Sequence, residues 1–528
     1  MASKKLQIWL PLILSLIMVI GMIIGFQLRD KSINNNFWAS GKKSSVQEVM
    51  DLVNSKYVDN VKTDSIDQII IEQFLSNLDP HSVYIPATNL KEVNEELMGK
   101  FEGIGVEFRM FNDTMNIVNI IKDGPSEKAG IMIGDEIIKV NDSIQLAGKK
   151  IGTDNIRKHL RGLEGSSVKV SILRNGVMKD ITITRGTIPV SSIDAAYLIE
   201  PTVGYVRINK FAENTYREFM NNLENLQKQG MQKLILDLRE NGGGLLNEAI
   251  NMADEFLDGN KLIVYTEGIH SPRKEYHCER DGLFEKGALV VLVDETSASA
   301  SEVLAGALQD WDRATIIGRR TFGKGLVQLQ YSLSDGSAVR LTIARYFTPL
   351  GRNIQKSYSN GKEKYEEELL NRYHDGELIK QDSSKLQGTP FKTPKGHIVY
   401  GGGGITPDIF IPYDTSNMSI NNLKLYKKDV LSNFVYNLFR QQSDFFRSFK
   451  NTNELTQKFN LSESVWQQFR SFAKKDSVVL DNVKPKEKFE LLQHIQALMA
   501  RQIFRNEGYF EVMNKYDDAI QKALGSLK

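Results

Sequence analysis

"ALVVLVDETSASASEVLAGALQDW", residues 288–311, contains the pattern that decides the fold class. An apolar run typical of a buried strand ends at Asp294, and a turn of small residues then leads into an amphipathic helix. Two earlier stretches have the same order, with "VGYVRINKF" before the helical run 215–229 and "KLILDL" before the helical run 246–257. Because strands that alternate with helices are joined by crossover connections, we expect an α/β domain with a largely parallel sheet over residues 188–415.

The remaining chain divides into further regions. Short strands separated by Gly-Pro and Asn-Gly turn signals, among them "FEGIGVEFRM", "SVKVSILRN" and "KDITITR", predict a compact β-rich module over residues 99–187. Apolar residues at helical spacing predict a helical lead-in over residues 32–98 and aromatic-rich amphipathic helices over residues 416–528. A charged stretch at 356–397 is expected to be an insertion. These regions together predict a multidomain α+β protein.

Composition excludes several classes of function. The chain has 528 residues, too many for one hydrophobic core, and its 67 basic and 65 acidic side chains leave a formal charge of only +2. This balance gives no basic surface for nucleic acid. A single cysteine, Cys278, excludes an intrachain disulfide and a cysteine-rich zinc site. We expect neither a metal nor a cofactor.

The N-terminus contains a long uncharged segment. Residues 6–28 include no charged side chain, and a run of this length can cross a bilayer as a helix. The following "IIGFQLRD" offers no small-residue cleavage site, so an uncleaved transmembrane anchor is expected over residues 1–31. On this interpretation the protein is a single-pass protein of the cytoplasmic membrane. Its catalytic body would then lie in the periplasm or another extracytoplasmic space.

"GRRTFGKG", residues 318–325, fits the phosphate-binding P-loop pattern except at Gly325, which replaces the Mg²⁺-binding hydroxyl residue. The residues that follow alternate in the manner of a strand, whereas a P-loop opens a helix. Lys324 is therefore expected at the head of a strand, with Gln328 on the same face. A lysine acts as a general base only when its pKa is lowered, because the ammonium form has no lone pair.

Ser299 lies where the strand-to-helix turn meets the start of a helix. Backbone N–H groups at a helix N-terminus can stabilise developing negative charge, which favours a nucleophile there. Ser299 and Glu302 also form an S-x-x-E capping box, so a purely structural cap is the alternative. The three glycines 242–244 between a strand and a helix allow backbone amides to approach a ligand closely, although tight packing explains them equally well.

Considered together, these motifs resemble those of the C-terminal processing peptidases, also called tail-specific proteases. The resemblance rests on "TSASASE", on "TFGKGLVQ" with its lysine 25 residues after Ser299, and on "LDLRENGGGLL", "RYFTPLGRNIQ", "GGGITPD" and "LDPHSVYIP". It covers about residues 78–412. The family implies a crotonase- or Clp-like catalytic domain that cleaves peptide bonds through an acyl-enzyme, with no cofactor.

The resemblance also assigns roles to residues. The middle serine of S-A-S-A-S, Ser299, is the nucleophile, Lys324 is the general base, and Gln328 positions the lysine. None of the seven histidines lies in a Ser-His-Asp context, and the histidine of "LDPHS", His81, is expected to be structural.

The oxyanion hole of the family uses one amide from the glycine loop and one from the residue after the nucleophile. These amides fall on Gly243 or Gly244, and on Ala300. The family more often has proline where this chain has Gly242, which leaves the choice between the two glycines open. Asp310 matches an acidic position in some members and is expected to be supportive at most.

The β-rich module resembles a PDZ domain, most clearly in "GPSEKAGIMIGDEIIKVND". Such a domain binds an extended C-terminal segment by strand addition, with backbone amides around the terminal carboxylate. Here those amides would come from Gly103, Ile104, Gly105 and Val106. The alternative is that the two glycines only permit a bulge in an edge strand.

These observations predict a membrane-anchored serine endopeptidase that recognises protein tails. A PDZ-type adaptor or chaperone that binds tails without cutting them is the alternative, and a P-loop nucleotide enzyme is a third reading. The expected partners are substrate proteins with accessible C-terminal tails and the membrane. The C-terminal helices are candidates for homo-oligomerisation or for binding an adaptor.

Overall fold

The computed structural model describes residues 44–59, 63–111, 113–148, 151–380, 388–414 and 420–528, with four isolated positions before them. It divides into two compact units, residues 1–71 and 72–528. The first unit contains α2 (Ser45–Lys56) and most of α3 (Thr63–Ser76). Ser44 caps α2, because its hydroxyl accepts the backbone N–H of Gln47.

The predicted membrane anchor requires correction. A helix needs about 20 apolar residues to cross a bilayer, and no helix in the described part of the chain is both long and apolar enough. The predicted segment, residues 6–28, lies outside the described residues except at those isolated positions. This finding contradicts the predicted single-pass anchor, the membrane as a partner and the extracytoplasmic location.

The second unit contains a six-stranded sheet that includes the stretch 288–311. Its strand order is β10-β11-β12-β15-β16-β21, and every neighbouring pair is parallel except β10 with β11. The four central strands, β11, β12, β15 and β16, are buried on both faces, which explains their largely continuous apolar sequences. The bounds of the six strands are Ile193–Glu200, Val203–Ile208, Lys233–Asp237, Leu289–Val293, Thr315–Gly318 and Ile409–Phe410.

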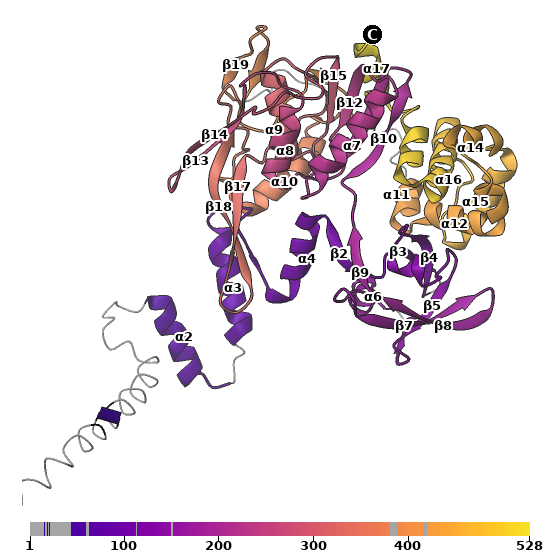
Figure 1. The fold of residues 1–528 in the computed structure, drawn as a ribbon, viewed down its shortest axis with the longest axis horizontal. Helices are drawn as coiled ribbons and strands as arrows, with labels where there is room; N and C mark the ends of the chain where they lie inside the picture. The colour runs from indigo at the N-terminus through magenta and orange to yellow at the C-terminus, as the bar shows by residue number, and fades with distance from the viewer. Residues whose placement is uncertain are drawn as a thin grey trace, which may run out of the picture. The chain divides into compact units, whose positions relative to one another are not determined.

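Helices cover both faces of this sheet. One face packs in a common core with α7 (Thr215–Lys228), α8 (Leu246–Asp254) and α9 (Ala300–Asp310), which Figure 1 shows close to β12 and β15. The other face packs against α17 (Asp518–Ser526), whose Ile520 is fully buried. The C-terminal helix therefore completes the core of the α/β domain.

A second, antiparallel sheet has the order β1-β18-β13-β14, with β17 paired to β18. It brings β1, from the helical lead-in, beside the hairpin that follows Lys324. After β1 the chain continues through α4 (Ala87–Met98) into the β-rich module. The strand bounds are Val83–Ile85, Leu262–Gly268, Ser271–His277, Leu326–Ser332 and Ala338–Phe347 for β1, β13, β14, β17 and β18.

The β-rich module has its own sheet and core. The sheet order is β3-β4-β5-β7-β8, with β6 beside β5, so β3 is an edge strand. Two short strands, β2 (Lys100–Gly103) and β9 (Gly186–Pro189), pair where the chain enters and leaves the module. The other elements are β3 (Val106–Phe111), β4 (Thr114–Ile120), α5 (Pro125–Lys128), β5 (Glu136–Val140), β6 (Ile144–Gln145), α6 (Thr153–Leu160), β7 (Ser167–Arg174) and β8 (Val177–Thr184).

The charged insertion and the C-terminal region complete the chain. The insertion contains α10 (Lys362–His374) and β19 (Pro390–Lys392), which pairs with β20 (Ile398–Tyr400) directly after the insertion. The C-terminal helices share a separate aromatic-rich core. They are α11 (Ile420–Lys427), α12 (Val430–Gln441), α13 (Ser443–Arg447), α14 (Thr452–Lys458), α15 (Glu463–Lys475) and α16 (Pro485–Met513).

Candidate active site

One cavity, of about 490 Å³, is lined by Arg319 and Arg320 in the loop before Lys324 and by residues of the insertion. Another, of about 360 Å³, brings together the residues that the sequence singled out in the catalytic domain. The lining of the smaller cavity runs from the glycine loop to the β17–β18 hairpin. Six predicted residues line it, namely Gly243, Gly244, Ser299, Ala300, Lys324 and Gln328. Segments separated by more than 80 residues in the sequence therefore meet at one site.

Ser299 has a strained backbone at the start of α9. Its φ of 56° is a positive value that side-chain-bearing residues rarely adopt, and such strain is concentrated at functional sites. The glycine loop packs directly against it: a Cβ added to Gly243 would lie 2.8 Å from Ser299 Cβ and 2.5 Å from the Ala298 carbonyl oxygen. Only glycine permits this approach, which brings backbone amides to the serine.

Two amides in the cavity are available to a ligand. The N–H of Gly243 donates to Asn241 Oδ1 at 2.9 Å. In the described part of the chain, no hydrogen bond engages the N–H of Gly244 or of Ala300. The N–H groups of Gly244 and Ala300 could therefore donate to an oxyanion, whereas the N–H of Gly243 already has an acceptor.

Lys324 is partly buried, and a side-chain amide holds its amine. Its Nζ donates to Gln328 Oε1 at 3.0 Å. Burial lowers the pKa of Lys324, and the positive charge of Arg340 lowers it further, while Asp79 and Glu302 oppose the shift. A lowered pKa increases the fraction of neutral amine, which is the form that can accept a proton. No hydrogen bond within the described residues joins this amine to the Ser299 hydroxyl; such bonds often form only when substrate binds.

The segment 318–325 connects β16 to β17 and starts no helix. The P-loop alternative therefore lacks the helix N-terminus that a phosphate requires. In place of phosphate contacts, the backbone of this segment bonds to a carboxylate. Glu302 Oε1 accepts from Gly323 N–H at 2.7 Å, and Glu302 Oε2 accepts from Lys324 N–H at 2.9 Å.

Glu302 thus does more than cap a helix. Its Oε2 also accepts the N–H of Ser299 at 2.8 Å, and its Oε1 accepts the hydroxyl of Thr321. The side chain is fully buried, and burial raises its pKa to about 7 although these hydrogen bonds lower it. The sequence suggested only the cap. The available signal for this second role was an acidic residue within the small and apolar first part of the helix, residues 300–308.

Sequence reasoning missed Tyr346 altogether. Its hydroxyl lies 3.1 Å from the carbonyl oxygen of Ser299 and 2.5 Å from that of Lys324. Burial raises its pKa well above the ordinary value, so it keeps its proton and donates. Nothing in "RYFTP" distinguishes this tyrosine from a core aromatic, because its partners are backbone atoms from other segments.

His81 approaches the site through its backbone. Its carbonyl oxygen accepts from Gln328 Nε2 at 2.5 Å, although the histidine belongs to the helical lead-in. Asp310, by contrast, does not line the cavity. At the far end of α9 it forms a fully buried ion pair with Arg352 at 2.5 Å. Within the described residues no cluster of side chains suits a metal ion.

The predicted tail-binding residues lie in the β-rich module. Gly103 ends β2, Val106 begins β3, and Ile104 and Gly105 form the turn between them. Gly105 has a φ of 72°, and a Cβ there would lie 2.9 Å from Ile188 Cδ1. The turn therefore leads directly into an edge strand, which is the arrangement that strand addition needs.

Comparison with known proteins agrees with these assignments at the level of family. The sequence models described as Peptidase family S41 and PDZ domain match residues 202–362 and 103–184, and a family of unknown function matches residues 422–505. A probable CtpA-like serine protease of Staphylococcus epidermidis is 36% identical over 362 residues, covering 66% of this chain and 72% of that protein.

Two further relatives have related names. A carboxy-terminal-processing protease of Bartonella bacilliformis is 35% identical, covering 58% of this chain and 71% of that protein. Among solved structures, a photosystem II D1 C-terminal processing protease is 26% identical and covers 70% of this chain and 87% of its own, with a TM-score of 0.37, too low to support an argument. With identities above one third over most of the curated relatives' length, this chain is a serine peptidase of family S41 that contains a PDZ domain.

Proposed function

We propose that this peptidase cleaves C-terminal regions of proteins with a serine–lysine dyad. Neutral Lys324 accepts the proton of the Ser299 hydroxyl, and the oxygen attacks the carbonyl carbon of the scissile peptide bond. The tetrahedral oxyanion receives hydrogen bonds from Ala300 and from Gly244 or Gly243. The C–N bond then breaks, the leaving amine takes the proton from Lys324, and an ester to Ser299 remains.

Water completes the proposed cycle. Lys324, neutral again, accepts a proton from water as the water oxygen attacks the ester carbonyl. The C–O bond to Ser299 then breaks, the serine oxygen takes the proton from Lys324, and the new C-terminus leaves. Gln328 keeps the amine directed into the cavity during both half-reactions. The observation that carries this proposal is the placement of partly buried Lys324 beside Gln328 in the cavity that also contains Ser299.

The proposal extends to substrate choice. A protein tail adds as a strand to the edge strand β3, and the amides of Gly103, Ile104, Gly105 and Val106 surround its terminal carboxylate. As domain limits we propose residues 99–187 for the PDZ domain, 188–415 for the catalytic domain with its insertion at 356–397, and 416–528 for the C-terminal helices. The helical lead-in is assigned to residues 32–98.

The decisive experiment follows cleavage of a protein with an accessible apolar tail. Mass spectrometry would identify the products of the wild-type chain and of Ser299→Ala and Lys324→Ala, with circular dichroism as the check on folding. We expect both variants to be folded and inactive. Full activity in either variant would contradict the dyad, and an intact substrate with the wild-type chain across a broad pH range would favour a tail-binding adaptor.

A further inference from the structure

The helix of the charged insertion, α10, contacts the active-site residues from outside the matched family region. Tyr365 in this helix is only 3% exposed, and its hydroxyl lies 2.8 Å from Nε2 of His81. The tyrosine ring meets the imidazole edge-on with 5.3 Å between centroids, and it meets Phe322 in the same way at 5.9 Å. The family match ends at residue 362, so this contact belongs to the insertion.

The direction of the hydrogen bond between Tyr365 and His81 follows from its surroundings. Burial raises the pKa of Tyr365, so the phenol keeps its proton. Burial and the charge of Lys324 lower the pKa of His81 to about 4, so the imidazole is neutral. Because Gln355 Nε2 donates to the phenol oxygen at 3.4 Å, the tyrosine hydrogen is free to point at His81 Nε2. The histidine proton then lies on Nδ1.

The side-chain amide of Gln328 links His81 to Lys324. The carbonyl oxygen of His81 can only accept, so the group of Gln328 that faces it at 2.5 Å must be the NH₂. This fixes the amide orientation and turns Oε1 toward Lys324 Nζ at 3.0 Å. If the His81 backbone shifted, the amide could rotate and present its NH₂ to the amine, which would push the amine away.

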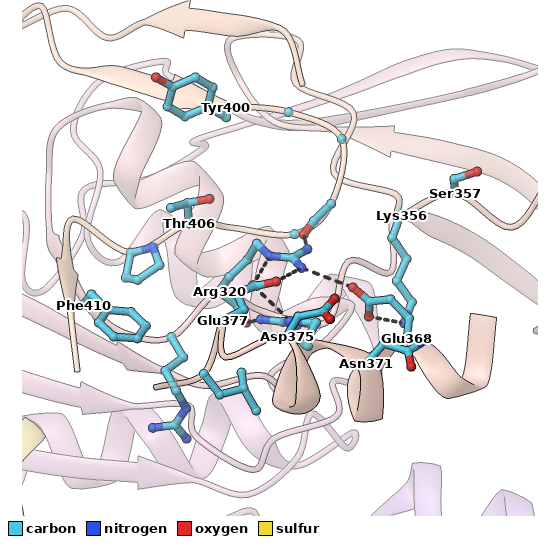
Figure 2. Close-up of a pocket in the computed structure, with 18 residues that line it drawn as sticks. Arg320, Lys356, Ser357, Glu368, Asn371, Asp375, Glu377, Tyr400, Thr406 and Phe410 are labelled. Carbon is cyan, nitrogen blue, oxygen red and sulfur yellow. Dashed lines mark hydrogen bonds and ion pairs between the residues drawn. The ribbon is translucent and has the colours of Figure 1, made fainter. Parts of the chain in front are cut away.

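Two turns beyond Tyr365, the same buried face of α10 holds the loop that precedes Lys324. Arg372 donates to the carbonyl oxygens of Arg320 and Thr321 at 2.6 and 3.2 Å. Figure 2 shows the larger, 490 Å³ cavity on this side, with Arg320 and Lys356 bonded to Glu368 and Glu377. The insertion is thus fixed to the Lys324 loop independently of Tyr365. This anchorage allows the tyrosine to hold His81 at a defined position.

We propose that Tyr365 is a positioning residue for peptide-bond cleavage, acting through His81 and Gln328 to hold the Lys324 amine toward Ser299. The inference rests on the proposed serine–lysine mechanism. It makes the insertion helix a functional part of the active site. Tyr365 touches neither the substrate nor the reacting atoms, so its effect must pass through Gln328.

A double-mutant cycle tests whether the effect of Tyr365 on cleavage passes through Gln328. Tyr365→Phe keeps the ring and removes the hydroxyl, so kcat/KM for the tail substrate should fall about three- to tenfold, as expected for one hydrogen bond. In a Gln328→Ala background, with enzyme in excess of substrate, the same change should have no further effect. Tyr358→Phe is the matched control, because it removes a hydroxyl in the same insertion, bonded to Arg345 and not to His81.

The outcomes separate this inference from the proposed function. Unchanged kcat/KM in Tyr365→Phe, or losses that multiply in the double variant, would overturn the inference while leaving the dyad intact. Cleavage by Ser299→Ala would instead contradict the dyad. Should Tyr365→Phe lower the melting temperature, the cycle still decides, because a purely structural loss would add to that of Gln328→Ala.

Discussion

The backbone N–H of Ser299 donates to Oε2 of Glu302 at 2.8 Å, and the same oxygen accepts the N–H of Lys324 at 2.9 Å. One buried carboxylate therefore joins the backbones of the proposed nucleophile and the proposed base. The two residues are 25 positions apart in the sequence, and their relative position depends on this shared acceptor.

Replacing Glu302 with glutamine should disrupt the site. The carboxylate oxygens accept three N–H groups and one hydroxyl, whereas the NH₂ of glutamine would face N–H donors on one side. We expect the free energy of unfolding to fall by roughly 2–4 kcal/mol, since two charge-assisted hydrogen bonds are lost, and we expect cleavage to be largely abolished. Denaturant titration and a cleavage assay measure the two effects. Glu363→Gln, on the exposed face of α10, is the control, and equal stability of the two variants would contradict this role.

Tyr346→Phe tests the second link between the same two segments. The change removes the hydroxyl that faces the carbonyl oxygens of Ser299 and Lys324 and leaves the buried ring in place. A lost hydrogen bond costs about 1 kcal/mol of stability, and a loss of the same size in the transition state lowers kcat about fivefold. Tyr331→Phe, on the exposed part of β17, should change neither. Unaltered kcat in Tyr346→Phe would show that the hydroxyl has no part in catalysis.

The sequence predicted the elements better than it predicted the contacts between them. Strand–helix alternation was sufficient for the parallel sheet, because both faces of its central strands are buried and their apolar runs are largely continuous. Motif spacing singled out Ser299 and Lys324, and both residues line one cavity. By contrast, the partners of Tyr346 are carbonyl oxygens, and the contact of His81 with Gln328 is also through a carbonyl. Backbone acceptors have no residue type, so no pattern of letters reveals them.

The same reasoning explains the strand that was not expected. "VYI", residues 83–85, is too short for its period to distinguish a strand from a helix, and it forms β1 only because β18 offers a free edge. The insertion was predicted from its charge alone, yet Tyr365 and Arg372 within it are buried against the active-site loop. Composition cannot reveal this, because their buried state depends on residues far away in the sequence.

The pH dependence of cleavage should change when the charge of Arg340 is removed. Protonated Lys324 cannot accept a proton, so kcat/KM falls as the pH drops through the Lys324 pKa. Arg340 lowers that pKa, and removing its charge in Arg340→Gln should therefore raise the pKa and move the acid limb of the profile to higher pH. Arg345→Gln is the control, because its charge is not among the causes of the shift. A limb that stays in place, or moves to lower pH, would contradict Lys324 as the base.

Glycine 243 and glycine 242 give the sharpest test of the loop that faces Ser299. Gly243 has a φ of 95°, and an added Cβ would meet the Ala298 carbonyl oxygen at 2.5 Å, so Gly243→Ala must displace either the loop or the start of α9. Gly242 has no atom within 4 Å of such a Cβ. We expect Gly243→Ala to lose about 1–3 kcal/mol of stability, and Gly242→Ala to melt at the wild-type temperature. Calorimetry measures both variants. The loop packs against the strained backbone of Ser299, so its displacement should also slow the reaction of the serine hydroxyl with a fluorophosphonate, which phosphonylates the oxygen and releases fluoride. An unchanged rate in Gly243→Ala would mean that the loop does not support the nucleophile.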